Sequence, residues 1–238
     1  MSSETSIYSL DGIELLAPLS PADRTSLARQ CKWRRYAPHE LIMDRLDNDT
    51  RDVCCVVEGR VRVVNHSLGG REISFDDVPS GGFLGELSAL DGEPRSATVE
   101  ALDETLCAFI PGAVFLELVA HNPALARALL LKLVKIIRRS TDRIMDLSTL
   151  GANNRVHAEL LCLAKLNLKR DNTAEITPIP VHNDIAARVS TTRETVARVL
   201  NDLARDGIVE RRSNVLVVRN FKALERMVED VRGDLRNL

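Results

Sequence analysis

Residues 82–98 (GFLGELSALDGEPRSAT) concentrate residue types that bind a small anionic ligand. Gly85 allows close backbone approach and opens a short helical turn, whose N–H groups can hold an anion. Arg95 supplies a positive charge and Ser96 a hydroxyl donor. Glu86 is unsuited to phosphate, but its carboxylate can accept from a sugar hydroxyl. This combination favours a cyclic nucleotide over a free phosphate. The alternative is a surface turn with an incidental Glu86–Arg95 ion pair.

Residues 181–203 have the pattern of two helices joined by a turn. The first has a short apolar face, and residues 189–191 are the expected turn. In the second, four apolar residues recur at the spacing of one buried helical stripe, and they are Val196, Val199, Leu200 and Leu203. Thr191 and Glu194 have the spacing of a capping box, which predicts where the second helix begins. The pattern indicates a helix-turn-helix.

The polar side chains of the second helix suit DNA recognition. Arg193, Glu194 and Arg198 are expected to reach base edges, because arginine pairs with guanine and glutamate accepts from cytosine. Thr191, Thr192 and nearby backbone N–H groups suit phosphates. In the bland alternative, Glu194 only completes the capping box and the arginines only solvate the surface.

Two β runs, residues 207–212 and 214–219, predict a wing after this helix. Arg211 and Arg212 are expected at its tip, where they can meet the phosphate backbone. The wing strengthens the DNA-binding interpretation.

The region before the helix-turn-helix is predicted to hold a helix over residues 155–168 and a polar loop over 169–177.

Residues 30–112 are rich in glycine and short β-like runs, which predicts an antiparallel roll or barrel. Residues 53–57 and 60–64 flank Glu58-Gly59 and predict a hairpin. Residues 68–70 predict a further turn. Cys54 and Cys55 lie in an apolar run and are expected to be buried small hydrophobes on opposite faces of a strand.

Residues 120–150 predict one long helix, with Pro123 near its start and Gly151 ending it. Residues at steps of three and four predict a coiled-coil seam, and they are Leu130, Leu133, Ile137, Ser140, Ile144 and Leu147. The flanking residues are expected to be solvated, and they are Lys132, Lys135, Arg138, Arg139, Asp142 and Arg143. We therefore favour pairing with the same helix of a second subunit over packing on its own domain. Ser140 interrupts the seam, so Ser140 and Thr141 can set its register or face a ligand.

Bulk properties exclude several classes of protein. The chain has 238 residues with a formal net charge of −2, so any basic DNA footprint must be local. We expect a cytoplasmic protein, because residues 1–8 do not resemble a secretory signal and no apolar run could span a membrane. The five cysteines show no CxxC spacing, so no metal is expected. There is no nucleophile elbow, HExxH motif, P-loop or paired-carboxylate site, so we expect no enzyme.

The order and separation of these motifs resemble the cyclic-AMP receptor protein and fumarate–nitrate reduction regulator superfamily, with the cyclic-AMP receptor branch most similar. The resemblance covers essentially the whole chain. The motifs that carry it are FLGEL at 83–87 with RSA at 95–97, ST at 140–141 and TRETVAR at 192–198. The segment between Glu86 and Arg95 is one residue shorter than in the best-known member. The hinge at residues 150–152 lacks an aspartate often found there.

The resemblance implies an α+β fold: an N-terminal antiparallel β-roll that binds a cyclic nucleotide (1–119), a dimerisation helix and hinge (120–151), and a C-terminal winged helix-turn-helix (152–238). By resemblance, the ligand would be cyclic AMP, with cyclic GMP as the alternative. Its contacts would come from Gly85, Glu86, Leu87, Arg95, Ser96, Ala97, Ser140 and Thr141. Glu86 would contact the ribose 2′-hydroxyl, Arg95 and Ser96 the cyclic phosphate, and Ser140 and Thr141 the base.

The implied partners are double-stranded DNA with a TGTGA-type half-site, a second copy of the chain, and RNA polymerase, with no membrane. Three alternatives remain. The first is a regulator of the same fold with a different or no ligand. The second is a cyclic-nucleotide module of a kinase or channel, for which no kinase motif or membrane span is found. The third is an enzyme, which measurable turnover of a cyclic nucleotide would favour.

Overall fold

The computed structural model describes residues 8–46, 50–67 and 72–232. The chain divides into two compact units, residues 1–136 and 137–238. The division falls inside one long helix, α4 (Pro123–Thr149). The boundaries of the three parts expected from the sequence, 1–119, 120–151 and 152–238, therefore stay a prediction.

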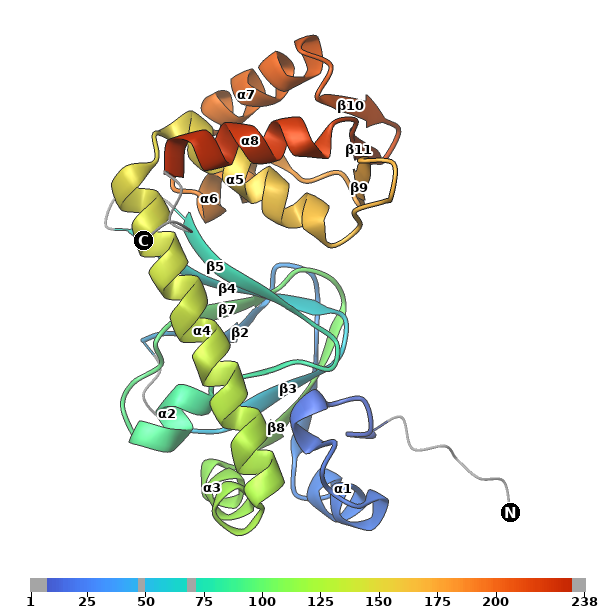
Figure 1. Cartoon of the computed structure of the whole chain (residues 1–238). Helices are drawn as coiled ribbons and strands as arrows, with labels where there is room; N and C mark the ends of the chain where they lie inside the picture. The colour runs from blue at the N-terminus through green and yellow to red at the C-terminus, as the bar shows by residue number, and fades with distance from the viewer. Residues whose placement is uncertain (1–7, 47–49, 68–71, 233–238) are drawn as a thin grey trace. The chain divides into compact units, whose positions relative to one another are not determined.

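Among the described residues, the first unit contains two four-stranded antiparallel sheets (Figure 1). One sheet has the strand order β1-β8-β3-β6 and the other β2-β7-β4-β5. The strands are β1 (Lys32–Tyr36), β2 (Leu41–Met43), β3 (Val53–Glu58), β4 (Arg60–His66), β5 (Glu72–Pro79), β6 (Phe83–Leu84), β7 (Thr98–Ala101) and β8 (Thr105–Ile110). The prediction of an antiparallel β-roll is confirmed.

Strand β3 is buried on both faces. Cys54 and Cys55 are both fully buried, and they belong to different apolar clusters. Cys55 packs with Phe115 and the helices, whereas Cys54 packs with Tyr36 between the sheets. The alternation of side chains along a strand explains this division. Both cysteines act as small core residues, as predicted.

The predicted hairpin of residues 53–57 and 60–64 is wrong. β3 pairs with β8 and β6, whereas β4 pairs with β5 and β7. Gly59 joins β3 to β4 at φ 79°, and a Cβ there would lie 2.3 Å from the Glu104 carbonyl oxygen. β3 and β4 follow each other through Gly59 but lie in different sheets. The turn predicted at residues 68–70 lies outside the described residues.

Several helices share one apolar cluster with the sheet β1-β8-β3-β6. They are η1 (Glu14–Leu16), α1 (Pro21–Ala28), α2 (Glu86–Asp91), α3 (Gly112–His121) and the first turns of α4. The long helix predicted over residues 120–150 is present as α4, which begins at Pro123 because α3 ends at His121 and the backbone is extended at Asn122. The Asn122 side chain accepts from the Leu125 N–H (3.0 Å) and caps α4, with Pro123 in its first turn as expected.

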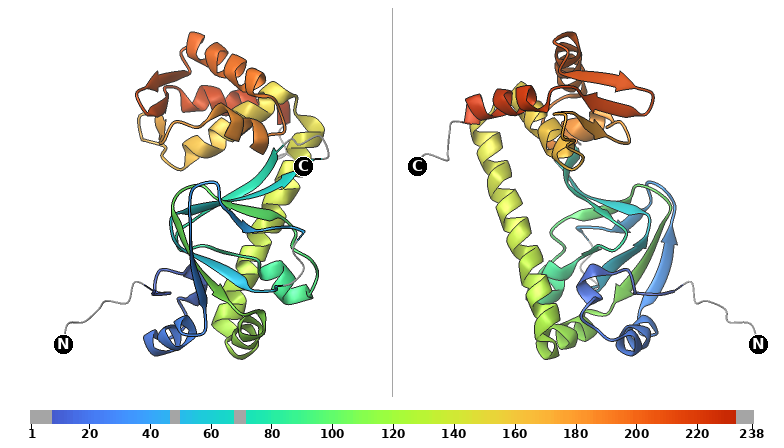
Figure 2. Two further views of the ribbon diagram at one scale, coloured as in Figure 1. Left: turned by 180° about the vertical axis from the view of Figure 1, so that it is seen from behind. Right: turned by 45° about the vertical axis from the view of Figure 1, so that its right-hand side comes forward.

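The second unit is a small α+β domain (Figure 2). Its elements are α5 (Ala152–Lys165), β9 (Ala174–Ile176), α6 (His182–Arg188), α7 (Arg193–Arg205), β10 (Val209–Arg212), β11 (Val215–Val218) and α8 (Phe221–Arg232). β9 lies within the predicted polar loop and pairs with β11, and α8 follows the wing. Neither β9 nor α8 was predicted from the sequence. The helix predicted over residues 155–168 lies three residues earlier.

Gly151 does not end α4 in the way predicted. A C-terminal glycine cap needs a left-handed residue, but Gly151 has φ −63° and ψ 160°. Gly151 is instead the residue that precedes α5, and its carbonyl accepts from the Arg155 N–H (3.1 Å). The break between α4 and α5 is therefore only two residues long.

Among the described residues, no single helix is long and apolar enough to cross a membrane, and α3 with α4 is so only as a pair bent by 110°. No group of three or more histidine, cysteine, aspartate or glutamate side chains is arranged to hold a metal ion within the described ranges.

Candidate ligand and DNA sites

Helix α2 is held between two glycines in the left-handed region. Gly85 precedes it at φ 85° and Gly92 follows it at φ 75°. A Cβ at Gly85 would lie 2.6 Å from Nη1 of Arg95. The close backbone approach predicted for Gly85 is therefore present, and the group approached is the arginine of the same motif.

Glu86 is buried in the first turn of α2, with 4% of its surface exposed. Its carboxylate lies 3.3 Å from Nζ of Lys132 on α4. The Lys132 ammonium also donates to the Phe83 carbonyl and lies 3.6 Å from the centre of the Phe83 ring. Burial lowers the pKa of Lys132, and the nearby Glu86 charge partly opposes that effect. Lys132 is therefore part of the site.

The expectation that all flanking residues of the long helix are solvated is wrong for two of them. Lys132 and Arg143 are half-buried, whereas Lys135, Arg138, Arg139 and Asp142 are exposed. Sequence reasoning missed Lys132 because a lysine beside an apolar seam usually extends to solvent. The signal was its position inside the apolar run of residues 128–137.

Arg95 is a buried cation, with 5% of its surface exposed. Its guanidinium donates to the Ser88 hydroxyl (2.8 Å), the Gly85 carbonyl (3.1 Å) and the Asp52 carbonyl (2.8 Å). These hydrogen bonds hold the guanidinium in one position. Through these bonds Arg95 also links the start of α2 to Asp52, the residue that precedes β3.

The other residues predicted for the ligand site lie nearby in the chain but are less buried. Ser96 is exposed, Ala97 is half-buried, and Leu87 is 37% exposed. Ser140 and Thr141 belong to the second unit and are exposed on α4. The structure brings Gly85 and Arg95 together, with Glu86 beside Gly85. The ligand-binding roles of all the residues predicted for this site stay predictions.

Helices α6 and α7 form the predicted helix-turn-helix. Ile185, Ala186 and Val189 are buried on the α6 side. Val196, Val199 and Leu203 are buried on α7, and Leu200 packs against them. The turn between the helices includes Ser190 at φ 53°, a region that glycine adopts more easily than serine.

The predicted capping box of Thr191 and Glu194 is wrong, because α7 begins one residue later than that box requires and its third residue is Thr195. The cap of α7 is Thr192, whose hydroxyl accepts from the Thr195 N–H (3.2 Å), whereas Thr191 is buried. Hydrogen bonds from its own N–H and from Thr192 lower the pKa of Glu194, which therefore stays ionised. Both threonine positions fit a capping pattern in sequence, so only the backbone geometry distinguishes them.

The side chains predicted to read bases are exposed. Arg193, Glu194 and Arg198 all lie on the solvent side of α7. Nη2 of Arg198 donates to Oδ1 of Asn153 in the first turn of α5 (3.3 Å). α7 thus presents two cations and one carboxylate from the first half of one helix, which is the part that enters a major groove in this motif.

Strands β10 and β11 form the predicted wing, and its turn includes Ser213 at φ 45°. Arg211 is exposed beside this turn. Arg212 pairs with Glu210 (2.8 Å), which Arg219 also contacts. These two arginines lower the pKa of Glu210, so its negative charge offsets part of the wing's positive charge. Arg211 is the better candidate for a phosphate contact.

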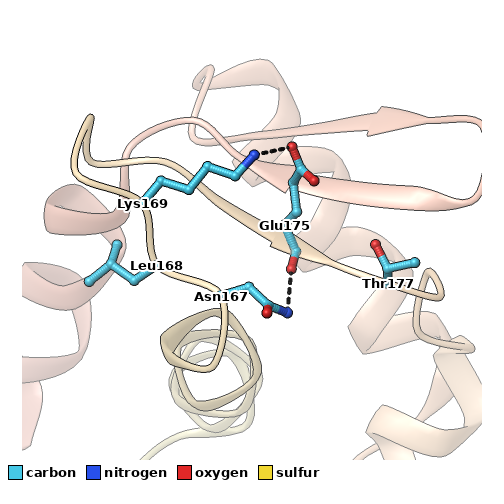
Figure 3. A pocket seen from close by; sticks show the side chains of 5 residues that line it. All are labelled: Asn167, Leu168, Lys169, Glu175 and Thr177. Carbon is cyan, nitrogen blue, oxygen red and sulfur yellow. Dashed lines mark hydrogen bonds and ion pairs between the residues drawn. The ribbon is translucent and has the colours of Figure 1, made fainter.

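A shallow hollow of about 410 Å³ lies in the second unit (Figure 3). It is lined by Asn167, Leu168, Lys169, Glu175 and Thr177. Lys169 pairs with the Glu175 carboxylate, and Asn167 donates to the Glu175 carbonyl. Because these polar groups bind each other and none is buried, the hollow lacks the convergent polar groups of a ligand site.

Comparison with known proteins identifies both units. The model of the cyclic nucleotide-binding domain matches residues 33–122, and that of the Crp-like helix-turn-helix domain matches residues 154–227. The cyclic AMP receptor protein of Thermus thermophilus is 33% identical over 170 residues, which cover 71% of this chain and 76% of that protein.

Two solved structures share the fold at lower identity. A mutant of CooA from Carboxydothermus hydrogenoformans has a TM-score of 0.75 and 21% identity, covering 84% of this chain and 89% of that one. CLP, described as a c-di-GMP responsive global regulator of Xanthomonas campestris, has a TM-score of 0.65 and 21% identity, covering 80% of this chain and 94% of that one.

The roll with its α2 motif and the winged helix-turn-helix define a transcriptional regulator with a cyclic nucleotide-binding domain. The chain belongs to the cyclic-AMP receptor protein and fumarate–nitrate reduction regulator superfamily. The family is one of transcriptional regulators, and its members are generally not enzymes.

Proposed function

We propose that the chain is a cyclic-nucleotide-responsive regulator that binds a palindromic DNA site as a homodimer. The observation that carries this proposal is the buried pair of opposite charges at the two ends of the α2 motif, Glu86 and Arg95. Contacts within the chain hold both groups in place: Lys132 lies on Glu86, and Arg95 donates to Ser88 and to backbone carbonyls, so the motif fixes one carboxylate and one guanidinium. A cyclic nucleotide offers a sugar hydroxyl for Glu86 and a phosphate for Arg95.

In this proposal Gly85 and Leu87 border the ligand, and Ser96 and Ala97 add contacts to the cyclic phosphate. Ser140 and Thr141 face the base, Ser140 in its own subunit and Thr141 across the dimer. Cyclic AMP is the first candidate, in line with the name of the Thermus thermophilus relative, and cyclic GMP is the alternative. A threonine hydroxyl both donates and accepts, so it can serve either base.

The exposed seam of α4 supports the homodimer. Leu130, Ile137 and Ile144 are 61%, 64% and 64% exposed, and Leu147 is 42% exposed. Apolar residues repeating along one helix are the pattern of a coiled coil, and a second copy of the same helix is the simplest partner. Ile137→Glu should produce a monomer in analytical ultracentrifugation. Leu166→Glu is the control, because Leu166 is 81% exposed but lies outside the seam.

Each subunit would place α7 in a major groove, with Arg193, Glu194 and Arg198 at base edges and Thr191 and Thr192 near phosphates. Arg211 and Arg212 would meet the backbone from the wing. A nucleotide can activate such a dimer only if it binds the DNA-competent state more tightly than the other state. We also propose that this regulator contacts RNA polymerase and is located in the cytoplasm.

The test is fluorescence anisotropy of a palindromic TGTGA-type duplex at fixed salt, without ligand, with cyclic AMP and with cyclic GMP. Enhancement by one nucleotide would support the switch and identify its ligand. Arg95→Leu should abolish that enhancement. DNA affinity that neither nucleotide changes would reject cyclic-nucleotide control.

A regulator of the same fold with another ligand, or with none, is the second candidate. The observation that favours it is that neither buried charge lacks contacts: Lys132 lies on Glu86, and Arg95 donates to Ser88, Gly85 and Asp52. In that case Arg95→Leu would leave DNA binding unaltered in the same assay.

A further inference from the structure

The first turn of α5 connects the end of α4 to the helix-turn-helix. Arg155 donates from Nη1 to the Leu150 carbonyl (2.8 Å), from Nε to the Val189 carbonyl (2.8 Å) and from Nη2 to the Ser190 carbonyl (3.1 Å). One guanidinium therefore holds the residue that follows α4 and two residues of the turn before α7. A planar group with donors fixed in one plane sets the relative position of the carbonyls that it binds.

The turn held by Arg155 has an unfavourable backbone conformation. Ser190 has φ 53°, and a non-glycine residue there costs free energy that the surroundings must offset. Arg155 donates to the carbonyls of Val189 and Ser190, directly at this unfavourable turn. The next residue, Thr191, donates its N–H to the Ala186 carbonyl (3.0 Å), which makes its amide a probe of the turn.

We infer that Arg155 is a positioning residue that fixes the recognition helix α7 relative to the end of α4. This inference rests on the DNA-binding role proposed above. In a dimer joined through α4, the position of α7 relative to the end of α4 decides whether two copies of α7 fit half-sites on one duplex. Arg155 touches no base in this scheme, so its loss affects the fit of two half-sites more than the reading of one. The nearby contact of Asn153 with Arg198 reinforces the same connection.

The test compares Arg155→Gln with the wild-type chain on a palindromic duplex and on a duplex with one half-site. The advantage of the palindrome should fall about tenfold or more, with half-site affinity changed by less than about twofold. Arg155→Lys keeps the positive charge but has fewer hydrogen-bond donors. Its palindrome advantage should therefore lie between those of the wild-type chain and Arg155→Gln. Arg188→Gln is the matched control, because Arg188 links α6 to Glu159 on α5 (3.1 Å) and should leave the ratio unchanged.

A second substitution separates positioning from local stabilisation. Ser190→Gly removes the strain of the turn, so Arg155→Gln combined with Ser190→Gly should restore slow hydrogen exchange at the Thr191 amide. The inference expects the palindrome advantage to stay low in this double variant. Full recovery of that advantage would overturn the inference, because Arg155 would then only stabilise the turn.

Hydrogen exchange also tests the inference when the proposed DNA site is wrong. If the wild-type chain binds neither duplex, the proposed DNA-binding function fails, but Arg155→Gln must still accelerate exchange at Thr191 about tenfold or more. Exchange unchanged by Arg155→Gln would overturn the inference, whatever the DNA result.

Discussion

Replacing Gly85 by alanine tests the geometry of the α2 motif directly. The left-handed backbone at φ 85° costs a residue with a Cβ about 1–2 kcal/mol. The new Cβ would also lie 2.6 Å from Nη1 of Arg95. Moving that buried nitrogen weakens its hydrogen bonds to Ser88 and Gly85, and a hydrogen bond to a charged group contributes about 1.5–3 kcal/mol. We expect Gly85→Ala to destabilise the first unit by about 3–5 kcal/mol.

Gly92→Ala provides the matched control at the other end of the same helix. Gly92 has φ 75°, but no atom lies within 4 Å of its ideal Cβ position. This substitution should therefore cost only the backbone term of about 1–2 kcal/mol. The difference between the two variants, about 2–3 kcal/mol, measures the close approach to Arg95.

Urea unfolding followed by tryptophan fluorescence measures both values. Trp33 is the single tryptophan of the chain and lies on β1, where its indole N–H donates to the Ala28 carbonyl (3.0 Å). The signal therefore reports on the first unit, and the midpoint with the slope gives the free energy of unfolding. Equal destabilisation by the two variants, within about 0.5 kcal/mol, would refute the argument, since Arg95 would then move aside at no cost.

Three further outcomes are expected. Asp77→Asn should destabilise the first unit by about 3–5 kcal/mol in the same urea assay, because it breaks a buried two-point ion pair with Arg62 (2.8 and 3.1 Å); a loss below about 1 kcal/mol would contradict this. Thr192→Ala should cost the second unit about 1 kcal/mol, since its hydroxyl caps α7 (3.2 Å); an unchanged thermal midpoint by circular dichroism would argue against that role. Burial lowers the pKa of His157 below 6.5, so the unfolded chain binds more protons in acid; stability should be full above about pH 6.5 and fall below it, and His157→Gln should remove that slope from thermal midpoints measured between about pH 5 and 8.

Motifs that act over a short stretch of chain were predictable. The glycine, glutamate and arginine of the α2 motif were recognised within one short stretch of chain, and the structure brings Gly85 and Arg95 together, although their spacing alone left a surface turn as an alternative. The helix-turn-helix was identified because Val196, Val199 and Leu203 fall on one helical face and are buried as predicted. Local errors were of one to a few residues, as at Thr192, where two adjacent threonines offered the same cap.

Features that depend on partners far along the chain were not predictable. The proposed hairpin at Gly59 failed because β3 pairs with β8, about fifty residues later, and a pattern of apolar residues does not identify the neighbouring strand. Strand β9 was missed because its three residues become a strand only by pairing with β11. Lys132 was expected in solvent because nothing local shows that its ammonium reaches Glu86, forty-six residues earlier.

The sequence by itself determined the two classes of element, the order of the motifs and the family, because periodicity and spacing are properties of a short stretch of chain. Tertiary structure alone decided which charges meet. Whether Glu86 pairs with Arg95 or Lys132, and which carbonyls Arg155 binds, depends on how the backbone brings distant segments within hydrogen-bond distance. Such contacts need two atoms within about 3 Å of each other. A sequence pattern does not place side chains from distant segments that closely.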